Sequence, residues 1–180
     1  MKPSLSLLLI GLIALLSGCS LSPNSTTDVP DSRPADLNVH YHWQEGSLPP
    51  PFHYEYNITL KPQGQGKVVL TPDYPSDNVP TWTETFTVSA AELDQFYQVL
   101  FNQGLFRQTW RAQAVPPIGG SSQSVTVMAH GLKIEIPAYV LPEQEAAAAA
   151  ICSAVRALVP EAIWDKLDTQ RQQYIQEQQQ

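Results

Sequence analysis

The sequence predicts an α+β domain: an antiparallel sheet of about five to six strands with two to three helices packed on one face. Five short segments alternate apolar and polar residues with the period of two that marks a half-buried strand, and a sixth strand is inferred from the turn before it. Other segments carry the wider apolar spacing of an amphipathic helix. Consecutive strand segments are joined by turns and loops without helical crossovers, which favours antiparallel pairing and leaves one sheet face open to water or a partner.

The first three predicted strands follow one another closely. Residues 37–44 alternate apolar and polar side chains, and residues 52–60 do so more cleanly than any other segment. The prolines at 49–51 separate the two segments, because proline disrupts both helices and central strands. Residues 61–66 supply turn chemistry, so residues 67–71 are expected to return as the second arm of a hairpin.

A fourth strand and the first helix come next. Threonines alternate with apolar residues over 81–88, and Glu84, which interrupts the apolar face, is expected near a strand end or in an ion pair. Ser89 and Glu92 have the spacing of a capping box, in which each side chain binds a backbone amide at the helix start. An apolar stripe follows, and Gly104 is expected to end the helix in the left-handed conformation.

The C-terminal half again contains segments with strand-type alternation, followed by segments with helical apolar spacing. Residues 124–129 and 132–136 are predicted strands, joined by a two-residue hairpin turn at His130 and Gly131. Pro142 suits the first position of a helix, and the alanine-rich segment after it is expected to be helical to about Leu158. A last helix follows Pro160, with a frayed Gln-rich tail at 176–180.

The N-terminus reads as a secretory signal over residues 1–18, with Lys2, an apolar run and small residues before the cut. The run is too short to span a membrane, which takes about 20 residues. Residues 19–36 are rich in Ser, Thr, Asp and Pro and are predicted to be a disordered tether. Residues 37–175 would form a single domain.

Leu16-Ser17-Gly18-Cys19 resembles the lipobox of bacterial lipoproteins. The resemblance implies cleavage before Cys19, which would carry a diacylglycerol and an N-acyl chain such as palmitate and anchor the protein to a membrane. Ser20, rather than Asp, follows the cysteine, which in Gram-negative lipoproteins resembles an outer-membrane sorting signal, with the protein on the periplasmic side. In a Gram-positive cell the same motif implies the outer face of the cytoplasmic membrane.

Charge and cysteine content restrict the function further. The chain has a formal net charge of −7, which gives no reason to expect nucleic acid or anionic lipid as a partner. Cys152 would be the one remaining thiol after lipidation of Cys19, so no internal disulfide is expected. Its place in an apolar helix predicts a buried, inert side chain, and no cofactor is indicated beyond the lipid.

The segment from Trp110 to Ser122 is the longest without a period, and loops of this length are often functional. Tryptophan, arginine, proline and isoleucine are residue types found at binding surfaces. The candidate partner-binding residues are Trp110, Arg111, Pro116, Pro117 and Ile118. The alternative is that Trp110 and Ile118 fold back to close the edge of the core.

Three histidines form the candidate metal site. His40 and His42 are two residues apart on one strand, so both rings leave the same face, and His53 is expected on the polar face of the neighbouring strand. Three imidazoles are suitable ligands for zinc or copper. The alternative is that these are ordinary polar positions on a solvated sheet face.

No catalytic constellation is found. Ser121 and Ser122 follow two glycines without the Gly-x-Ser-x-Gly pattern of a nucleophile elbow. The carboxylate pair Glu55 and Glu84 would need a cleft to raise one pKa. The sequence therefore predicts a protein that is not an enzyme.

The order of elements over residues 50–165 resembles uncharacterised α+β domains of bacterial lipoproteins. That resemblance rests on structural motifs, so it implies a fold and a location and no catalytic residue. The predicted function is a membrane-anchored envelope module that binds an envelope protein or a small ligand. The alternatives are a protein inhibitor or assembly factor that uses loop 110–122, and a histidine-based metal-binding protein.

Overall fold

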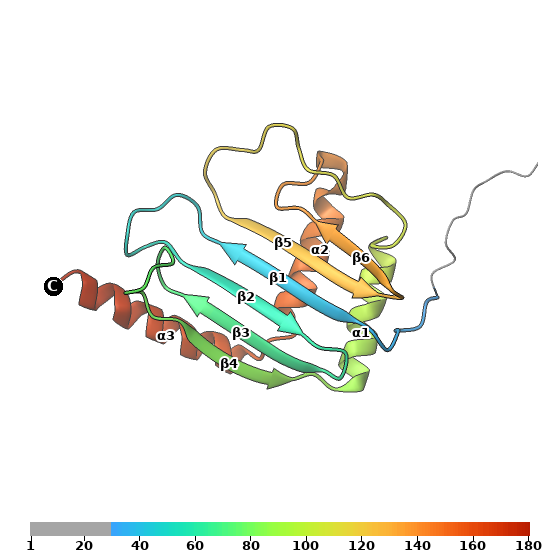
Figure 1. The fold of residues 1–180 in the computed structure, drawn as a ribbon, viewed down its shortest axis with the longest axis horizontal. Helices are drawn as coiled ribbons and strands as arrows, with labels where there is room; N and C mark the ends of the chain where they lie inside the picture. Colours follow the sequence, from blue (N-terminus) through green and yellow to red (C-terminus); the bar gives the residue numbers. More distant parts are fainter. Residues whose placement is uncertain (1–29) are drawn as a thin grey trace, which may run out of the picture.

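The computed structural model describes residues 30–180, so the predicted signal segment and Cys19 lie outside the described residues. Its centre is one antiparallel sheet of six strands in the order β4-β3-β2-β1-β5-β6 (Figure 1). The strands are β1 (Asn38–Gln44), β2 (Glu55–Leu60), β3 (Gln65–Thr71), β4 (Trp82–Thr87), β5 (Ser122–Ala129) and β6 (Leu132–Ile136).

The helices lie together on one face of this sheet, behind it in Figure 1. They are α1 (Ala90–Asn102), α2 (Glu145–Ala157), which is preceded by the 3-10 turn η1 (Pro142–Gln144), and α3 (Glu161–Gln178). The predicted α+β fold is confirmed, with the larger of the predicted numbers of strands and helices.

The core fills the space between the sheet and the helices. Apolar residues of all six strands point toward the helices because their alternation matches the two-residue period of the strand. Among the most deeply buried are Val39, Ile58, Val68 and Val127 from the sheet, and Leu100, Ile151 and Leu167 from the three helices. Burying a large aliphatic side chain stabilises a fold by about 1.5–3 kcal/mol, so this layer holds the helices in place.

The opposite face of the sheet carries no helix and is polar. Adjacent residues across β1, β2, β3 and β4 on this open face are His40, Thr59, Lys67 and Thr85. The neighbouring row begins with His42 and Asn57. These rows place hydroxyl, imidazole, amide and ammonium groups on the open face, and Glu55 and Glu135 add carboxylates to it.

The two ends of the sheet differ in their connections (Figure 1). The hairpin end holds residue 37, where the chain enters β1, and the short connections 61–64 and 130–131. The loop end holds the connections 45–54, 72–81 and the part of 103–121 that leads into β5.

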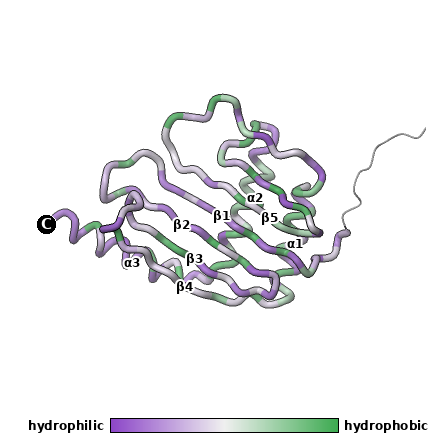
Figure 2. The backbone as a smooth tube through the Cα atoms, in the orientation of Figure 1, coloured by the Kyte–Doolittle hydropathy of each residue, from purple (hydrophilic) through white to green (hydrophobic). Residues whose placement is uncertain are grey.

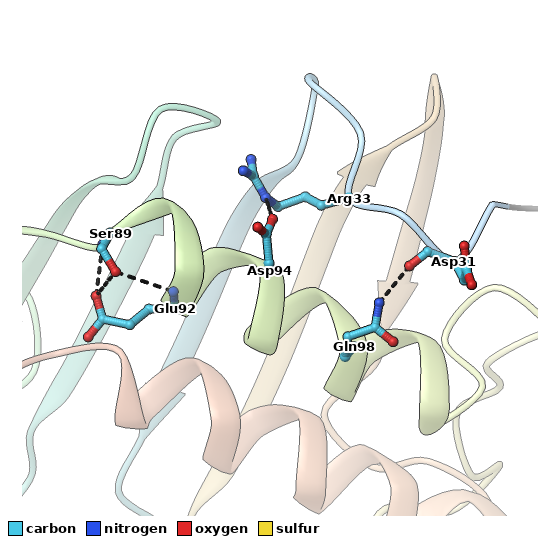
Figure 3. Close-up of polar contacts among 6 residues, drawn as sticks. All are labelled: Asp31, Arg33, Ser89, Glu92, Asp94 and Gln98. Carbon is cyan, nitrogen blue, oxygen red and sulfur yellow. Dashed lines mark hydrogen bonds and ion pairs between the residues drawn. The ribbon is translucent and has the colours of Figure 1, made fainter.

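Helix α1 forms as its sequence predicts. The Ser89 hydroxyl accepts from the Glu92 amide at 3.3 Å and the Glu92 carboxylate accepts from the Ser89 amide at 2.8 Å, which confirms the capping box (Figure 3). The Ser89 hydroxyl donates to the Glu92 carboxylate at 2.6 Å, and this bond first, then the bond from the Ser89 amide, holds the pKa of Glu92 below its usual value. Gly104 has φ +72°, and the Leu105 amide donates to the Leu100 carbonyl at 3.0 Å. This is the Schellman arrangement that satisfies the last carbonyls of a helix.

Residues 30–36 are attached to the domain, which corrects the predicted boundary of the tether at 36. Arg33 pairs with Asp94 of α1 at 2.6 Å, and Gln98 donates to the Asp31 carbonyl at 2.6 Å (Figure 3). The Tyr97 hydroxyl donates to the Pro30 carbonyl at 2.7 Å. Composition predicted a tether because the segment has little to bury, but these contacts are polar and involve residues far away in the sequence.

Asp36 fastens the same segment to the β5–β6 hairpin. Its carboxylate accepts the His130 amide at 2.8 Å and the Gly131 amide at 2.7 Å. Both turn residues have positive φ, as the predicted two-residue hairpin requires. The amide of Gly131 is the main cause that holds the pKa of Asp36 below its usual value.

Strand β4 forms one edge of the sheet and carries a charged residue on its inner face. Glu84 forms an ion pair with Lys166 of α3 at 2.6 Å, which was one of the two arrangements expected for this residue. Charged residues that point inward on an edge strand oppose pairing with another strand.

Two predicted boundaries are wrong. Strand β2 begins at Glu55 instead of residue 52, because Phe52 and His53 belong to the preceding loop. Helix α3 continues to Gln178, through part of the tail predicted to fray from 176. Within residues 30–180, no single helix has the length and apolarity to span a membrane; Pro142–Ala157 and α3 meet that test only as a pair bent by 89°.

Candidate binding surface at the loop end

The exposed apolar side chains of the described domain gather at the loop end. Seven large apolar side chains are exposed in residues 30–180, and five of them lie on the three loops of this end: Leu48, Phe52, Tyr74, Val115 and Ile118. Figure 2 shows hydrophobic stretches in the loop that leads into β5. The other two, Met128 and Leu132, lie at the hairpin end. Clustered exposed apolar residues mark interaction sites more often than scattered ones do.

A hollow of about 550 Å³ lies among the loops at this end. It is open to solvent on one side, and its walls come from all three loops and from the segment after β6. The residues that shape it include Gly46, His53, Tyr74, Pro117, Gly120 and Tyr139. Its size falls within the range of small-ligand sites, about 300–1,000 Å³.

Ring stacking between His53 and Tyr74 fixes two of these loops. The rings are parallel within 3° and their centroids are 3.9 Å apart. The Tyr74 hydroxyl donates to the Leu48 carbonyl at 2.9 Å, and His53 Nδ1 lies 3.3 Å from the Gly46 carbonyl oxygen. Loops 45–54 and 72–81 therefore form one surface.

Asp73 connects this surface to the helix layer. Its carboxylate accepts the Tyr74 amide at 2.7 Å and the Tyr174 hydroxyl at 3.5 Å. Burial is the main cause that raises the pKa of Tyr174, and the nearby negative charge of Asp73 raises it further. Helix α3 thereby supports the loop from behind.

The third loop approaches through two glycines. A Cβ built on Gly46 would lie 2.5 Å from the Gly120 carbonyl oxygen and 2.8 Å from its amide nitrogen. Only glycine at position 46 allows the two backbones this close. Gly120 has φ +80°, a conformation that favours glycine. The paired glycines thus join loop 103–121 to loop 45–54.

The five predicted partner-binding residues separate into two groups. Trp110 is buried, and its indole Nε1 donates to the Leu105 carbonyl at 3.1 Å, so this residue closes the core edge as the alternative proposed. Arg111 is exposed, and its backbone bonds to Gln144 and Leu141. Pro116 and Pro117 line the hollow, and Ile118 is fully exposed at 105%.

The three histidines do not converge. His40 and His42 share the open face, as predicted, but they bond to Thr59 at 3.2 Å and Asn57 at 3.1 Å. His53 is buried at the loop end in its stack with Tyr74. Among residues 30–180 no three His, Cys, Asp or Glu side chains are placed to hold a metal ion. The predicted three-histidine site is therefore not formed.

The other candidate groups occupy structural positions. Cys152 is 2% exposed in α2, and burial raises the pKa of its thiol to about 12, so the reactive thiolate is suppressed. Glu55 pairs across from Thr71 on the open face, whereas Glu84 lies across from the buried Val68 on the helix side. These two carboxylates cannot share a proton.

Several residues of this surface were not singled out from the sequence. Tyr74 and Tyr139 lie in aperiodic segments, and Leu48 and Phe52 flank a proline run that indicated only a break. The signal that was available is the aromatic or apolar residue beside proline in each loop. The chain matches no protein-family model and no curated protein.

Proposed function

We propose that the chain is a lipid-anchored envelope protein that acts as a non-enzymatic binding module and presents its loop end to a protein partner. The observation that carries the proposal is the difference between the two ends of the domain. Residues 30–36 lead into the hairpin end, whereas five exposed apolar side chains lie at the loop end. A domain held through its N-terminus would direct the loop end away from the membrane.

The chemistry of the loop end suits a protein partner. Aromatic and aliphatic side chains on supported loops supply the buried centre of an interface, and polar groups around them supply the rim. The His53–Tyr74 stack and the Gly46–Gly120 contact hold the loops in one arrangement. Such preorganisation lowers the entropy cost of association.

The anchor is tested first. In cells that express the full chain, labelled palmitate should enter the wild-type protein and not Cys19→Ala, and the variant should keep its signal segment. Fractionation should place the wild-type protein in the outer membrane of a Gram-negative host. Unlabelled wild-type protein recovered from the cytosol with its leader uncut would contradict the anchor.

The binding surface is tested by photo-crosslinking in the same cells. A photoreactive residue at position 118 should yield a discrete protein adduct, and one at position 128 should not. The two natural side chains, Ile118 and Met128, are both exposed but lie at opposite ends. Adding Leu48→Asp should abolish the adduct at 118 without changing the melting temperature. Equal adducts from both positions would refute a loop-end surface.

A second function is favoured by one observation: Ile118 projects fully into solvent at the loop that precedes β5. A protein inhibitor or assembly factor would insert this loop into a cleft of its target. Ile118→Asp alone would then abolish binding while Leu48→Asp has little effect. A broad docking surface would instead lose affinity with either substitution.

A further inference from the structure

A second hollow, of about 480 Å³, lies at the hairpin end. The open-face side chains that line it come from β2, β3, β4 and the β2–β3 turn: Thr59, Lys61, Gln65, Lys67, Thr85 and Thr87. The strand register explains their convergence, because Thr59, Lys67 and Thr85 are direct neighbours across three strands and Gln65 pairs with Thr87.

None of the polar side chains that line this hollow carries a negative charge. They are two ammonium groups, three hydroxyls and one amide, and no carboxylate lines the site. This differs from the chain as a whole, in which 17 acidic residues outnumber 10 basic ones. A cleft lined by one sign of charge concentrates the electrostatic field and attracts the opposite charge.

Lys61 and Lys67 are available for a ligand. Of the four lysines in residues 30–180, Lys133 pairs with Glu135 and Lys166 pairs with Glu84. Lys61 and Lys67 pair with no carboxylate of the described domain. Both are exposed, so their ammonium groups can reorient toward a bound anion.

We infer that this hollow binds a phosphate group carried on a small ester. Lysine ammonium groups bind phosphate as point charges, and hydroxyls and amides donate further hydrogen bonds to its oxygens. The hollow offers two ammonium groups and no guanidinium, so it would hold a phosphate through point charges and hydroxyl donors instead of a bidentate fork. The volume leaves room for the group esterified to the phosphate.

The position of the hollow near the start of β1 indicates that such an ester could be the headgroup of a membrane lipid. Val39 pairs with Leu60, so Lys61 lies one residue further along, beside the start of β1 where the chain enters the sheet. Eleven residue steps separate Cys19 from Pro30 (30 − 19 = 11), a span of at most about 36–40 Å. The headgroup phosphates of an anchoring membrane would therefore be within reach. This source, unlike the phosphate site itself, rests on the proposed lipid anchor.

The site is tested with the full chain in a maltoside detergent, with inorganic phosphate and glycerol phosphate as probes. Amide chemical shifts of residues 59–67 and 85–87 should change and saturate. Lys61→Gln/Lys67→Gln should weaken binding at least tenfold, while Arg107→Gln/Lys133→Gln removes the same charge elsewhere and should leave it unchanged. Thr85→Val, which keeps all charges, should weaken binding less than the lysine pair does. Linear shifts without saturation, or equal losses in both double variants, would overturn the site.

The source is tested with the lipidated protein reconstituted into vesicles. Amine-reactive labelling read by mass spectrometry should show Lys61 and Lys67 protected in vesicles that contain phosphatidylglycerol, relative to detergent, while Lys166 labels equally in both. Saturable glycerol phosphate binding without this protection would overturn the headgroup source. Loss of palmitate labelling would refute the anchor and leave the phosphate site standing. Loss of phosphate binding would refute the site and leave the anchor standing.

Discussion

Gly66 and Phe86 face each other on β3 and β4, and their contact permits a quantitative prediction. A Cβ built on Gly66 would lie 2.2 Å from Cε2, 2.3 Å from Cζ and 2.6 Å from Cδ2 of the Phe86 ring. All three distances are shorter than real side chains tolerate. The ring therefore occupies the volume that any side chain at position 66 would need.

Gly66→Ala should destabilise the protein although alanine is the better strand residue. Overpacking costs about 1–3 kcal/mol, and the lower entropy of the unfolded alanine chain returns about 0.5–1 kcal/mol. The two ranges combine to a net loss of roughly 0–2.5 kcal/mol, centred on about 1 kcal/mol, and each kcal/mol lowers the melting temperature by about 2–4 °C for a domain of this size. Urea and thermal unfolding followed by circular dichroism measure both quantities.

The companion variant Phe86→Val makes the reasoning testable. Valine lacks all three of the ring atoms that would clash with a Cβ at position 66, and it keeps the β-branched shape that strands favour. In this background Gly66→Ala should stabilise the protein by about 0.5–1 kcal/mol, so its effect changes sign. The explanation fails if Gly66→Ala is neutral or stabilising in the wild type, or if the two effects add within about 0.5 kcal/mol.

Three further predictions concern other parts of the chain. The pKa of Asp36 is lower in the folded protein than in the unfolded chain. The Asp36 carboxylate therefore stabilises the fold at pH values above its unfolded pKa, and this stabilisation is lost as the pH falls toward its folded pKa. Asp36→Asn should accordingly reduce the fall in melting temperature below about pH 4. Trp110→Ala should lower the free energy of unfolding by about 3–5 kcal/mol because the ring is buried. Ile118→Asp should change it by no more than about 0.5 kcal/mol because the side chain is in solvent. Equal losses in denaturant unfolding would contradict this difference between the two residues of the loop. Cys152 should resist a disulfide reagent in the native protein and react fully in urea, since burial raises its pKa to about 12; rapid labelling of the native thiol would show that it is accessible.

Local signals made much of the fold predictable. The Ser89–Glu92 pair and Gly104 mark the two ends of α1 through bonds within a few residues, and the turn at His130 and Gly131 needs only its own backbone preferences. Strand faces follow from alternation, because one face must be buried. Sequence reasoning works in these cases because the cause lies close to the residue.

Features that depend on distant contacts could not be predicted. Trp110 and Ile118 are both apolar and lie in one aperiodic segment, yet one is buried and the other is in solvent. His53 continues the alternation of β2, but its ring stacks on Tyr74 in another loop and leaves the strand. Residues 30–36 bond to side chains and backbone amides about 60 positions or more away. A single sequence contains no signal for such partners.

The inward Glu84 on β4 has a consequence for crowded chains. An unprotected sheet edge is a template for intermolecular strand addition. If a seventh strand were added to the sheet beside β4, its inward side chains would contact the Glu84–Lys166 ion pair. Such a strand would need an apolar surface at this position to bury them. The pair therefore opposes extension of the sheet past β4 by a strand of a neighbouring copy.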